Sequence, residues 1–384
     1  MTTVKNATYH NNKGDLFASF DVADFEVPAG RDEVWRFVPL RRLRGLHDGS
    51  FKPADAMDIS VSTPEGVRVS TVEPSDERLR VAGGAVDRVG AQVWSSAHEA
   101  TLVQISGDVK EPVTITVTGR GLDVTTFGII AIELAPLATA TVHVHYVGSG
   151  THADVTTVNI ADGAQLTMIS HEDWADDAVH LGSTKAVLAK DAVLRHNAAC
   201  FGGELVRLVP SVKFTAPGGD AEMLGVYFAD DGQFFEQRLL VDHAVPNCRS
   251  NVLYKGALQA KPESELPEAR TAWVGDVLIR AGAQGTDTYE ANRNLVLTEG
   301  ARADAVPNLE IETGNIVGAG HAATVGRFDD DQLFYLRSRG IPESEARRLI
   351  VRGFFSEVIG RIPVAEVREE LEARITEELK NTQL

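Results

Sequence analysis

The residue with the clearest potential for chemistry is His321, which lies in the stretch NLEIETGNIVGAGHAATVG at residues 308–326. The first half of this stretch alternates apolar and charged residues, as a half-covered β-strand does. The second half is a run of small residues around His321, and such a run lets another backbone approach closely. A neutral imidazole can ligate a metal ion. The residue types alone fit a metal ligand and an imidazole packed into an interface equally well.

The two cysteines, Cys200 and Cys248, are the next candidates for chemistry. Two cysteines at this spacing cannot make a CxxC…CxxC metal site. His196 precedes Cys200 by four residues, which is about 13 Å along a strand, and Arg249 could lower the pKa of Cys248. We interpret both as buried structural cysteines in a reduced protein.

His143 and His145 are two residues apart in the segment TVHVHYV. On a strand they would project from the same face. They could hold Zn²⁺ or Cu²⁺ if a third ligand came from elsewhere in the fold. No acidic residue lies within the segment, and the interpretation we favour is an exposed polar face.

The acidic segment HEDWADD, residues 171–177, offers Glu172, Asp173, Asp176 and Asp177. Two carboxylates 5–10 Å apart could act as the acid and base of a glycosidase. The chain has a net charge of −18, however, and acidic loops are common in such a protein. We therefore favour a solvated loop.

Short β-branched segments separated by Gly, Asp or Asn fill residues 100–260 and predict strands. A small residue recurs after a turn in these segments, at steps of 26, 28 and 29 residues. The recurring positions are Ala138, Ala164, Ala192 and Ala221. Two strands and two turns per repeat predict one coil of a β-solenoid. A sandwich also uses short strands, but it does not explain the recurring alanine.

Helical signals return near the C-terminus, where an acidic run starts a predicted helix at 329–338. Gly340 ends it, a second helix follows with Pro342 in its first turn, and a third begins after Pro363. The second helix carries an apolar face made of Ala346, Leu349, Ile350, Gly353, Phe354 and Val358.

Near the N-terminus, a short helix before Pro39 is predicted, with Trp35, Phe37 and Leu40 as anchors. The chain therefore divides into an N-terminal mixed α/β segment at 1–95, a mainly β core at 96–327 and a C-terminal helical domain at 328–384.

The bulk composition excludes several classes of protein. The 384 residues carry a net charge of −18 and a pI near 5.0, which argues against nucleic acid or an anionic membrane as a partner. No apolar run reaches the roughly 18–20 residues of a membrane span, and no signal peptide is evident, so we expect a cytoplasmic protein. No GxxxxGK[ST], HExxH or GxSxG elbow is found, so no motif predicts an enzyme.

An ordered series of segments resembles the SufB/SufD family of iron–sulfur cluster assembly proteins, and its SufD branch more closely. The segments are RSNVLYKGAL at 249–258, GTDTYEANRNLVLTEGARADAVPNLEIETGNIV at 285–317, HAATVG at 321–326 and LFYLRSRGIPESEARRLIVRGFFSEVI at 333–359. The resemblance implies a right-handed parallel β-helix core flanked by N- and C-terminal helical segments. It also implies a scaffold, not an enzyme, that works with a SufB-type subunit and a SufC-type ABC ATPase.

The resemblance implies roles for particular residues. His321 matches the family histidine at the cluster site, and Ala319 stands where several members have a cysteine, so a thiolate ligand would come from the partner. Ala319, Gly320 and Thr324 would lie at the subunit interface. The residues expected to contact the ATPase are Phe334, Tyr335, Leu336, Arg337, Arg339, Phe354 and Phe355.

The resemblance also implies a transient iron–sulfur cluster shared with the partner subunit, ATP only at the ATPase, and in some complexes a flavin. A homodimer is expected when the partner is absent. Two other hypotheses remain: a β-helix carbohydrate-active enzyme that uses the acidic segment 171–177, and a standalone metal-binding or structural solenoid. The enzyme requires that segment in a lined groove, and the standalone solenoid requires C-terminal helices whose apolar residues are all packed internally.

Overall fold

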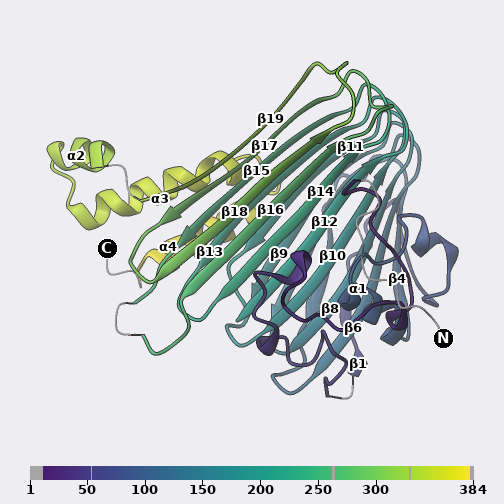
Figure 1. Cartoon of the computed structure of the whole chain (residues 1–384), viewed down its shortest axis with the longest axis horizontal. Helices are drawn as coiled ribbons and strands as arrows, with labels where there is room; N and C mark the ends of the chain where they lie inside the picture. Colours follow the sequence, from purple (N-terminus) through teal and green to yellow (C-terminus); the bar gives the residue numbers. More distant parts are fainter. Residues whose placement is uncertain (1–11, 53, 262–263, 328–329, 381–384) are drawn as a thin grey trace.

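The alanines that recur in the sequence mark successive coils of a solenoid. Ala138, Ala164, Ala192 and Ala221 are all at most 1% exposed and lie at or just before alternate strands. The computed structural model describes residues 12–52, 54–261, 264–327 and 330–380. Within them, a mainly parallel β-solenoid of about eight turns confirms the predicted fold class (Figure 1).

Each coil gives one strand to each of two sheets, so neighbours within a sheet are two strands apart in sequence. The ten-stranded sheet consists of β1 (Ala54–Ala56), β3 (Val67–Val72), β4 (Ala100–Ile105), β6 (Thr125–Leu134), β8 (Thr151–Ile160), β10 (Val179–Leu188), β12 (Leu205–Phe214), β14 (Phe234–His243), β16 (Ala269–Ile279) and β18 (Ala301–Ile311). The nine-stranded sheet consists of β2 (Asp58–Val61), β5 (Val113–Thr118), β7 (Thr139–Gly148), β9 (Gln165–Trp174), β11 (Val193–Cys200), β13 (Asp220–Ala229), β15 (Arg249–Leu258), β17 (Asp287–Val296) and β19 (Gly318–Gly326).

Both faces of most strands are covered, which explains why the strands read as nearly continuous apolar runs. The inward face forms the core between the sheets, with Val142, Val144, Tyr254 and Trp273 fully buried or nearly so. The outward faces are covered by the segments at the two ends of the chain, and both coverings add their own apolar clusters.

The two ends of the solenoid are built differently. At the N-terminal end, the short strands β2 and β3 pair antiparallel with β5 and β4, and so end the parallel stacking. At the other end, β18 and β19 are the last strands of their sheets and pair on one side only among the described residues. The C-terminal end therefore presents a free edge in each sheet.

The N-terminal segment covers the outer face of the ten-stranded sheet (Figure 1). Among its described residues, the α-helix α1 (Arg88–Ser96) is capped by the Asp87 side chain, which accepts from the backbone N–H of Gly90 at 2.8 Å. The helix predicted before Pro39 is only a 3-10 turn, Glu33–Trp35, but Trp35 is buried as expected. Residues 1–11 of the predicted first segment lie outside the described residues, and the domain boundaries stay a prediction.

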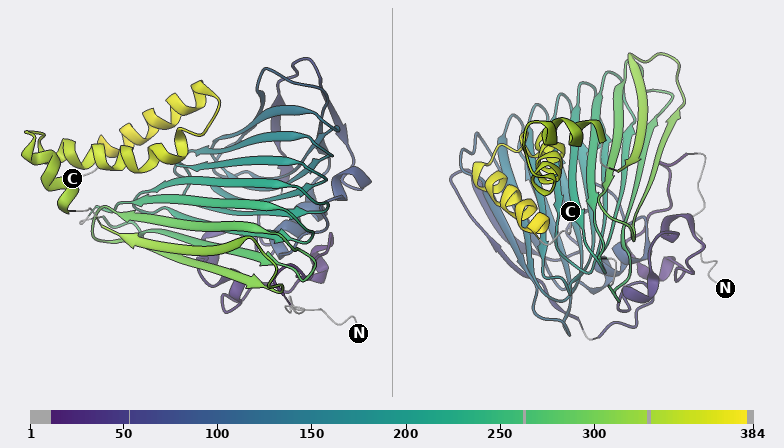
Figure 2. Two further views of the ribbon diagram at one scale, coloured as in Figure 1. Left: turned by 90° about the horizontal axis from the view of Figure 1, so that it is seen from above. Right: turned by 90° about the vertical axis from the view of Figure 1, so that its left-hand side faces the viewer.

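The three predicted C-terminal helices are present as α2 (Asp330–Ser338), α3 (Glu343–Ile359) and α4 (Ala365–Lys380), while residue 329 of the predicted first helix lies outside the described residues. Figure 2 shows that α3 and α4 lie along the nine-stranded sheet and that α2 projects beyond it. No helix in the described ranges combines the length and apolar content needed to cross a bilayer.

The apolar face predicted for the second helix is partly wrong. The buried residues of α3 are Ala346, Val351, Phe355, Val358 and Ile359, and the last four belong to the apolar cluster shared with the nine-stranded sheet. Leu349 is 37% exposed, and Phe354 is half-buried. The helix carries two apolar stripes, and periodicity alone does not say which of them packs.

Candidate functional site

The free end of the solenoid contains the first candidate site, because His321 lies on its terminal strand, β19. His321 pairs in register with Glu290 on β17, and its imidazole Nδ1 is 3.9 Å from Glu290 Oε1. Partners in a parallel ladder project to the same side, and Glu290 is fully buried, so His321 points inward over the open end of the core. Its side chain is nevertheless 45% exposed, since no further coil covers it in the described chain.

Glu290 is a residue that the sequence analysis missed. Neither of its carboxylate oxygens has a hydrogen-bonding partner among the described residues. Burial, and secondarily the nearby Asp276 carboxylate, raise the pKa of Glu290 to about 8. The spacing of 31 residues from His321 gives no local signal, because only the register of the coils brings the two together. An unpaired, destabilised carboxyl group beside an accessible imidazole is typical of a functional site.

The small residues around His321 have separable structural roles. Ala319 faces inward and packs against the core. Gly320 pairs with Tyr289, and a Cβ at Gly320 would lie only 3.0–3.1 Å from two ring carbons of that tyrosine. Thr324 is exposed on the outward face. The side chains around His321 on β19 are therefore small, which lets another backbone approach the free edge of this strand.

The C-terminal helices carry an exposed apolar surface. Phe334 and Tyr335 on α2 are 74% and 55% exposed, and the Arg339 guanidinium lies 5.0 Å from the Tyr335 ring. A groove of about 790 Å³ lies alongside, between these helices and β17. Its lining includes Leu295, Tyr335, Leu336, Leu349, Ile350 and Phe354. Arg337 is exposed near the same surface.

Phe355 does not belong to this surface, although the sequence analysis placed it there. Its side chain is fully buried and packs beside Phe228 of β13, with ring centroids 6.3 Å apart. Phe355 therefore helps to attach α3 to the solenoid. The adjacent Phe354 lies between the two environments, with the Lys255 ammonium 4.7 Å from its ring.

The interpretation of residues 171–177 as a solvated loop is wrong for its first half. His171, Glu172, Asp173 and Trp174 belong to strand β9, and Glu172 is 1% exposed inside the solenoid. Strand pairing with β7 and β11 draws this acidic stretch into the sheet. Glu172 therefore does not line an open groove, as the carbohydrate-active enzyme would require.

Glu172 belongs to a buried polar cluster centred on His180. The His180 ring contacts Glu172 at 2.7 Å through Nδ1 and Asp154 at 3.2 Å through Nε2. Tyr146 donates to Asp154 at 2.6 Å, and the Trp174 indole N–H donates to Glu172 at 2.7 Å. Burial alone would lower the pKa of His180, but the two carboxylates outweigh it and raise the pKa to about 10. The cluster is thus an internally paired ionic network.

The exposed polar face predicted for His143 and His145 is also wrong. His143 is 7% exposed and the His145 side chain 20% exposed, because α4 covers this part of the nine-stranded sheet. The cysteines behave as expected, since Cys200 and Cys248 are both free and buried. Burial raises the pKa of the Cys200 thiol well above its usual range, so the reactive thiolate is disfavoured.

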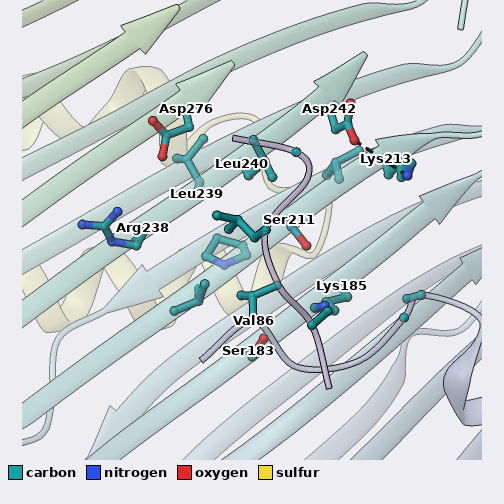
Figure 3. A pocket seen from close by; sticks show the side chains of 18 of the residues that line it. Val86, Ser183, Lys185, Ser211, Lys213, Arg238, Leu239, Leu240, Asp242 and Asp276 are labelled. Atoms are coloured by element: carbon teal, nitrogen blue, oxygen red, sulfur yellow. Dashed lines mark ion pairs between the residues drawn. The ribbon is translucent and has the colours of Figure 1, made fainter. Parts of the chain in front are cut away.

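A cavity of about 270 Å³ lies between the N-terminal segment and the ten-stranded sheet (Figure 3). It is lined by several cations, but these have partners. Lys213 lies 3.9 Å from Asp242, Arg238 donates to the backbone carbonyl of Glu33 at 3.0 Å, and Lys185 donates to that of Gly84. Of these three cations, only Lys213 faces a carboxylate; the carbonyls that accept from Arg238 and Lys185 are neutral and leave the charge of those two side chains in place.

The fold and the site together define a solenoid protein whose N-terminal end is closed by antiparallel strands and whose other end has an edge strand, β18 or β19, available for pairing in each sheet. Residues 116–354 match the family model described as "SUF system FeS cluster assembly, SufBD core domain". The chain is 60% identical, over 97% of its length and 94% of the relative, to the iron-sulfur cluster assembly SufBD family protein Mb1497 of Mycobacterium bovis. It is 57% identical to ML0594 of Mycobacterium leprae, over 100% of this chain and 98% of that one. This chain belongs to the SufBD family.

A more distant relative comes from one of the same organisms. The SufBD family protein Mb1496 of Mycobacterium bovis is 26% identical to this chain over 57% of its length, and the match spans 25% of that relative. A single organism therefore holds two quite different members of the family, one close to this chain and one distant from it.

Proposed function

We propose that this chain is a SufD-like scaffold subunit, not a catalyst, of an ATP-driven iron–sulfur cluster assembly complex. The observation that carries the proposal is the open end of the solenoid. The terminal strands β18 and β19 have 11 and 9 residues, and no strand of the described chain pairs with their outer edges. Such long edges are ordinarily covered, because they template pairing with another chain. A second SufBD subunit, which would extend both sheets, is the partner of matching geometry.

The presence of both a close and a distant relative in Mycobacterium bovis supports a heteromeric pair with a SufB-type subunit. The nascent cluster would be cargo held at the junction. At that junction, this chain would offer the cluster two ligand groups, the imidazole of His321 and the carboxylate of Glu290. Ala319 offers no thiolate, so sulfur ligands come from the partner. In the absence of that partner, the same edge would pair with a second copy of this chain.

The exposed residues of α2 support docking of a SufC-type ABC ATPase. Phe334 and Tyr335 project into solvent beside the groove, in contrast to the fully packed helices expected of a standalone solenoid. ATP would bind only to that partner, since this chain has no phosphate-binding loop motif. A flavin on the assembled complex stays an expectation from the family. Two free cysteines fit a cytoplasmic, reducing location.

The experiment is anaerobic co-expression with SufB-type and SufC-type partners, followed by pull-down and assay of bound iron and sulfide. Val325→Lys places a charge at an edge position that is 49% exposed and should reduce recovery of the SufB-type subunit. His321→Ala should leave the complex intact and lower its cluster content. If the wild type recruits neither partner, the scaffold proposal fails. If His321→Ala keeps full cluster content, the histidine only packs at the interface.

A further inference from the structure

Three histidines lie together on the outer face of the nine-stranded sheet, beneath α4. His143 and His145 come from β7 and His171 from β9, and His145 pairs in register with His171. The rings of His145 and His171 stack with centroids 4.7 Å apart and planes inclined by only 10°. His143 lies 5.2 Å from His145 and 5.8 Å from His171 by ring centroid. Asp173 follows on the same face of β9.

The ring nitrogens of this cluster are buried without partners. His171 is 1% exposed, and neither of its nitrogens has a hydrogen-bonding partner among the described residues. The same holds for Nε2 of His143 and of His145. Buried polar atoms normally have partners, because leaving them unpaired is unfavourable. Several unpaired nitrogens converging on one place indicate a ligand that accepts their lone pairs.

The donor geometry identifies the class of that ligand. One ligand atom each from His145, His171 and Asp173 lie within 4.8 Å of one another. His145 Nε2 is 3.9 Å from Asp173 Oδ2 and 4.0 Å from Glu370 Oε1 on α4. Bonds of about 2.0–2.2 Å around a tetrahedral ion separate its ligand atoms by roughly 3.3 Å, so the most distant of these donors need to approach one another by up to roughly 1.5 Å.

We propose that His145, His171 and Asp173 bind one divalent first-row transition-metal ion of the Zn²⁺ class, with Glu370 as a fourth ligand from α4. Two imidazoles and carboxylate oxygens are a donor set that such ions accept. The two carboxylates neutralise the charge of the ion. Arg374 is the nearby cation on α4, and its Nε lies 3.1 Å from a carboxyl oxygen of Glu378.

This site is distinct from the cargo site at His321. Strand β9 lies five positions from β19 in the nine-stranded sheet, which is about 24 Å at the usual strand spacing. Because Glu370 belongs to α4, the ion would bridge the solenoid and the C-terminal helices. The site would hold α4 in place on the sheet.

The test uses the full chain, stripped of metal with a chelator and titrated with Zn²⁺ by calorimetry. Wild type should bind one tight equivalent at this site, and His145→Ala and Asp173→Asn should each weaken it by at least about tenfold. These two positions are partly exposed, at 20% and 33%, so their replacement preserves packing. His98→Ala, at an exposed histidine outside both sites, is the matched control and should bind like wild type.

Hydrogen exchange of α4 gives a second readout. Zn²⁺ should slow exchange at residues 365–380 in wild type and in the His98→Ala control, but not in His145→Ala or Asp173→Asn. The proposal is overturned if wild type binds no ion, if the two site variants bind as tightly as wild type, or if bound Zn²⁺ leaves α4 exchange unchanged.

Discussion

Replacing Glu290 with Gln should stabilise the free protein, although Glu290 lies beside the proposed cargo site. The side chain is fully buried, and both its oxygens lack partners among the described residues. Its pKa rises from 4.5 to about 8, mainly because burial disfavours the charged form. Glutamine keeps the shape of the side chain but cannot ionise. It therefore removes the electrostatic penalty and keeps the packing.

The pH dependence of the effect follows from the raised pKa. Below pH 4.5 the carboxyl group is protonated in the folded and unfolded states alike, so no penalty exists. Between pH 4.5 and about 8 the unfolded state releases the proton while the folded state keeps it, and stability falls by about 1.4 kcal/mol per pH unit. The variant should thus gain roughly 3 kcal/mol at pH 7 and roughly 5 kcal/mol above pH 8.

The assay is urea unfolding of wild type and Glu290→Gln at several pH values between 4.5 and 9. Protein concentration must be held fixed, because self-association through the open edge would add to apparent stability. Glu299→Gln, at an exposed glutamate, is the matched control and should show a difference near zero throughout. A Glu290→Gln difference that does not change with pH, or a variant less stable than wild type at pH 7, would refute this account of Glu290.

Two further predictions concern the ionic core and the helical surface. His180→Asn should lower the free energy of unfolding by about 3–5 kcal/mol at pH 7, because it leaves Asp154 and Glu172 as uncompensated buried charges. The pKa of His180 is raised from 6.5 to about 10, so the stabilisation that protonated His180 gives the folded state is full below pH 6.5 and is lost as the pH rises through 10. Equal denaturation midpoints for wild type and His180→Asn at pH 7 would contradict this prediction. The double variant Phe334→Ser with Tyr335→Ser should weaken binding of the SufC-type ATPase by at least tenfold, which is about 1.4 kcal/mol. Because both side chains are exposed, its melting temperature should stay within about 2 °C of that of wild type. Calorimetric binding and thermal unfolding test the pair, and Phe355→Ser is the contrasting variant, which should unfold the helical attachment instead.

Much of the fold could be predicted from local patterns. The spacing of Ala138, Ala164, Ala192 and Ala221 predicted a coil of two strands, because each coil must return to the same turn. The three C-terminal helices followed from Gly340, Pro342 and Pro363, which punctuate them. The family series around His321 is also local in sequence. These features depend on neighbours along the chain, so a single sequence contains them.

Which face of an element becomes buried could not be predicted in the same way. Strands covered on both sides lose the clean alternation that separates inside from outside. His143 and His145 were therefore assigned to solvent, and Glu172 to a loop, although His143 and Glu172 are buried and the His145 side chain is only 20% exposed. Helix α3 has apolar residues on two sides, and only its docking on β13 and β15 decides that Phe355 is buried and Phe354 is not.

The sequence by itself determined the strands, the repeat, the helices, the absence of enzyme motifs and the place of His321 among small residues. Only the tertiary structure decided which groups meet. The coil register places Glu290 beneath His321 and His171 beside His145, across 31 and 26 residues. A slip of one residue in either ladder would turn these side chains to opposite faces. Contacts between coils depend on that register, which no local stretch of the chain encodes.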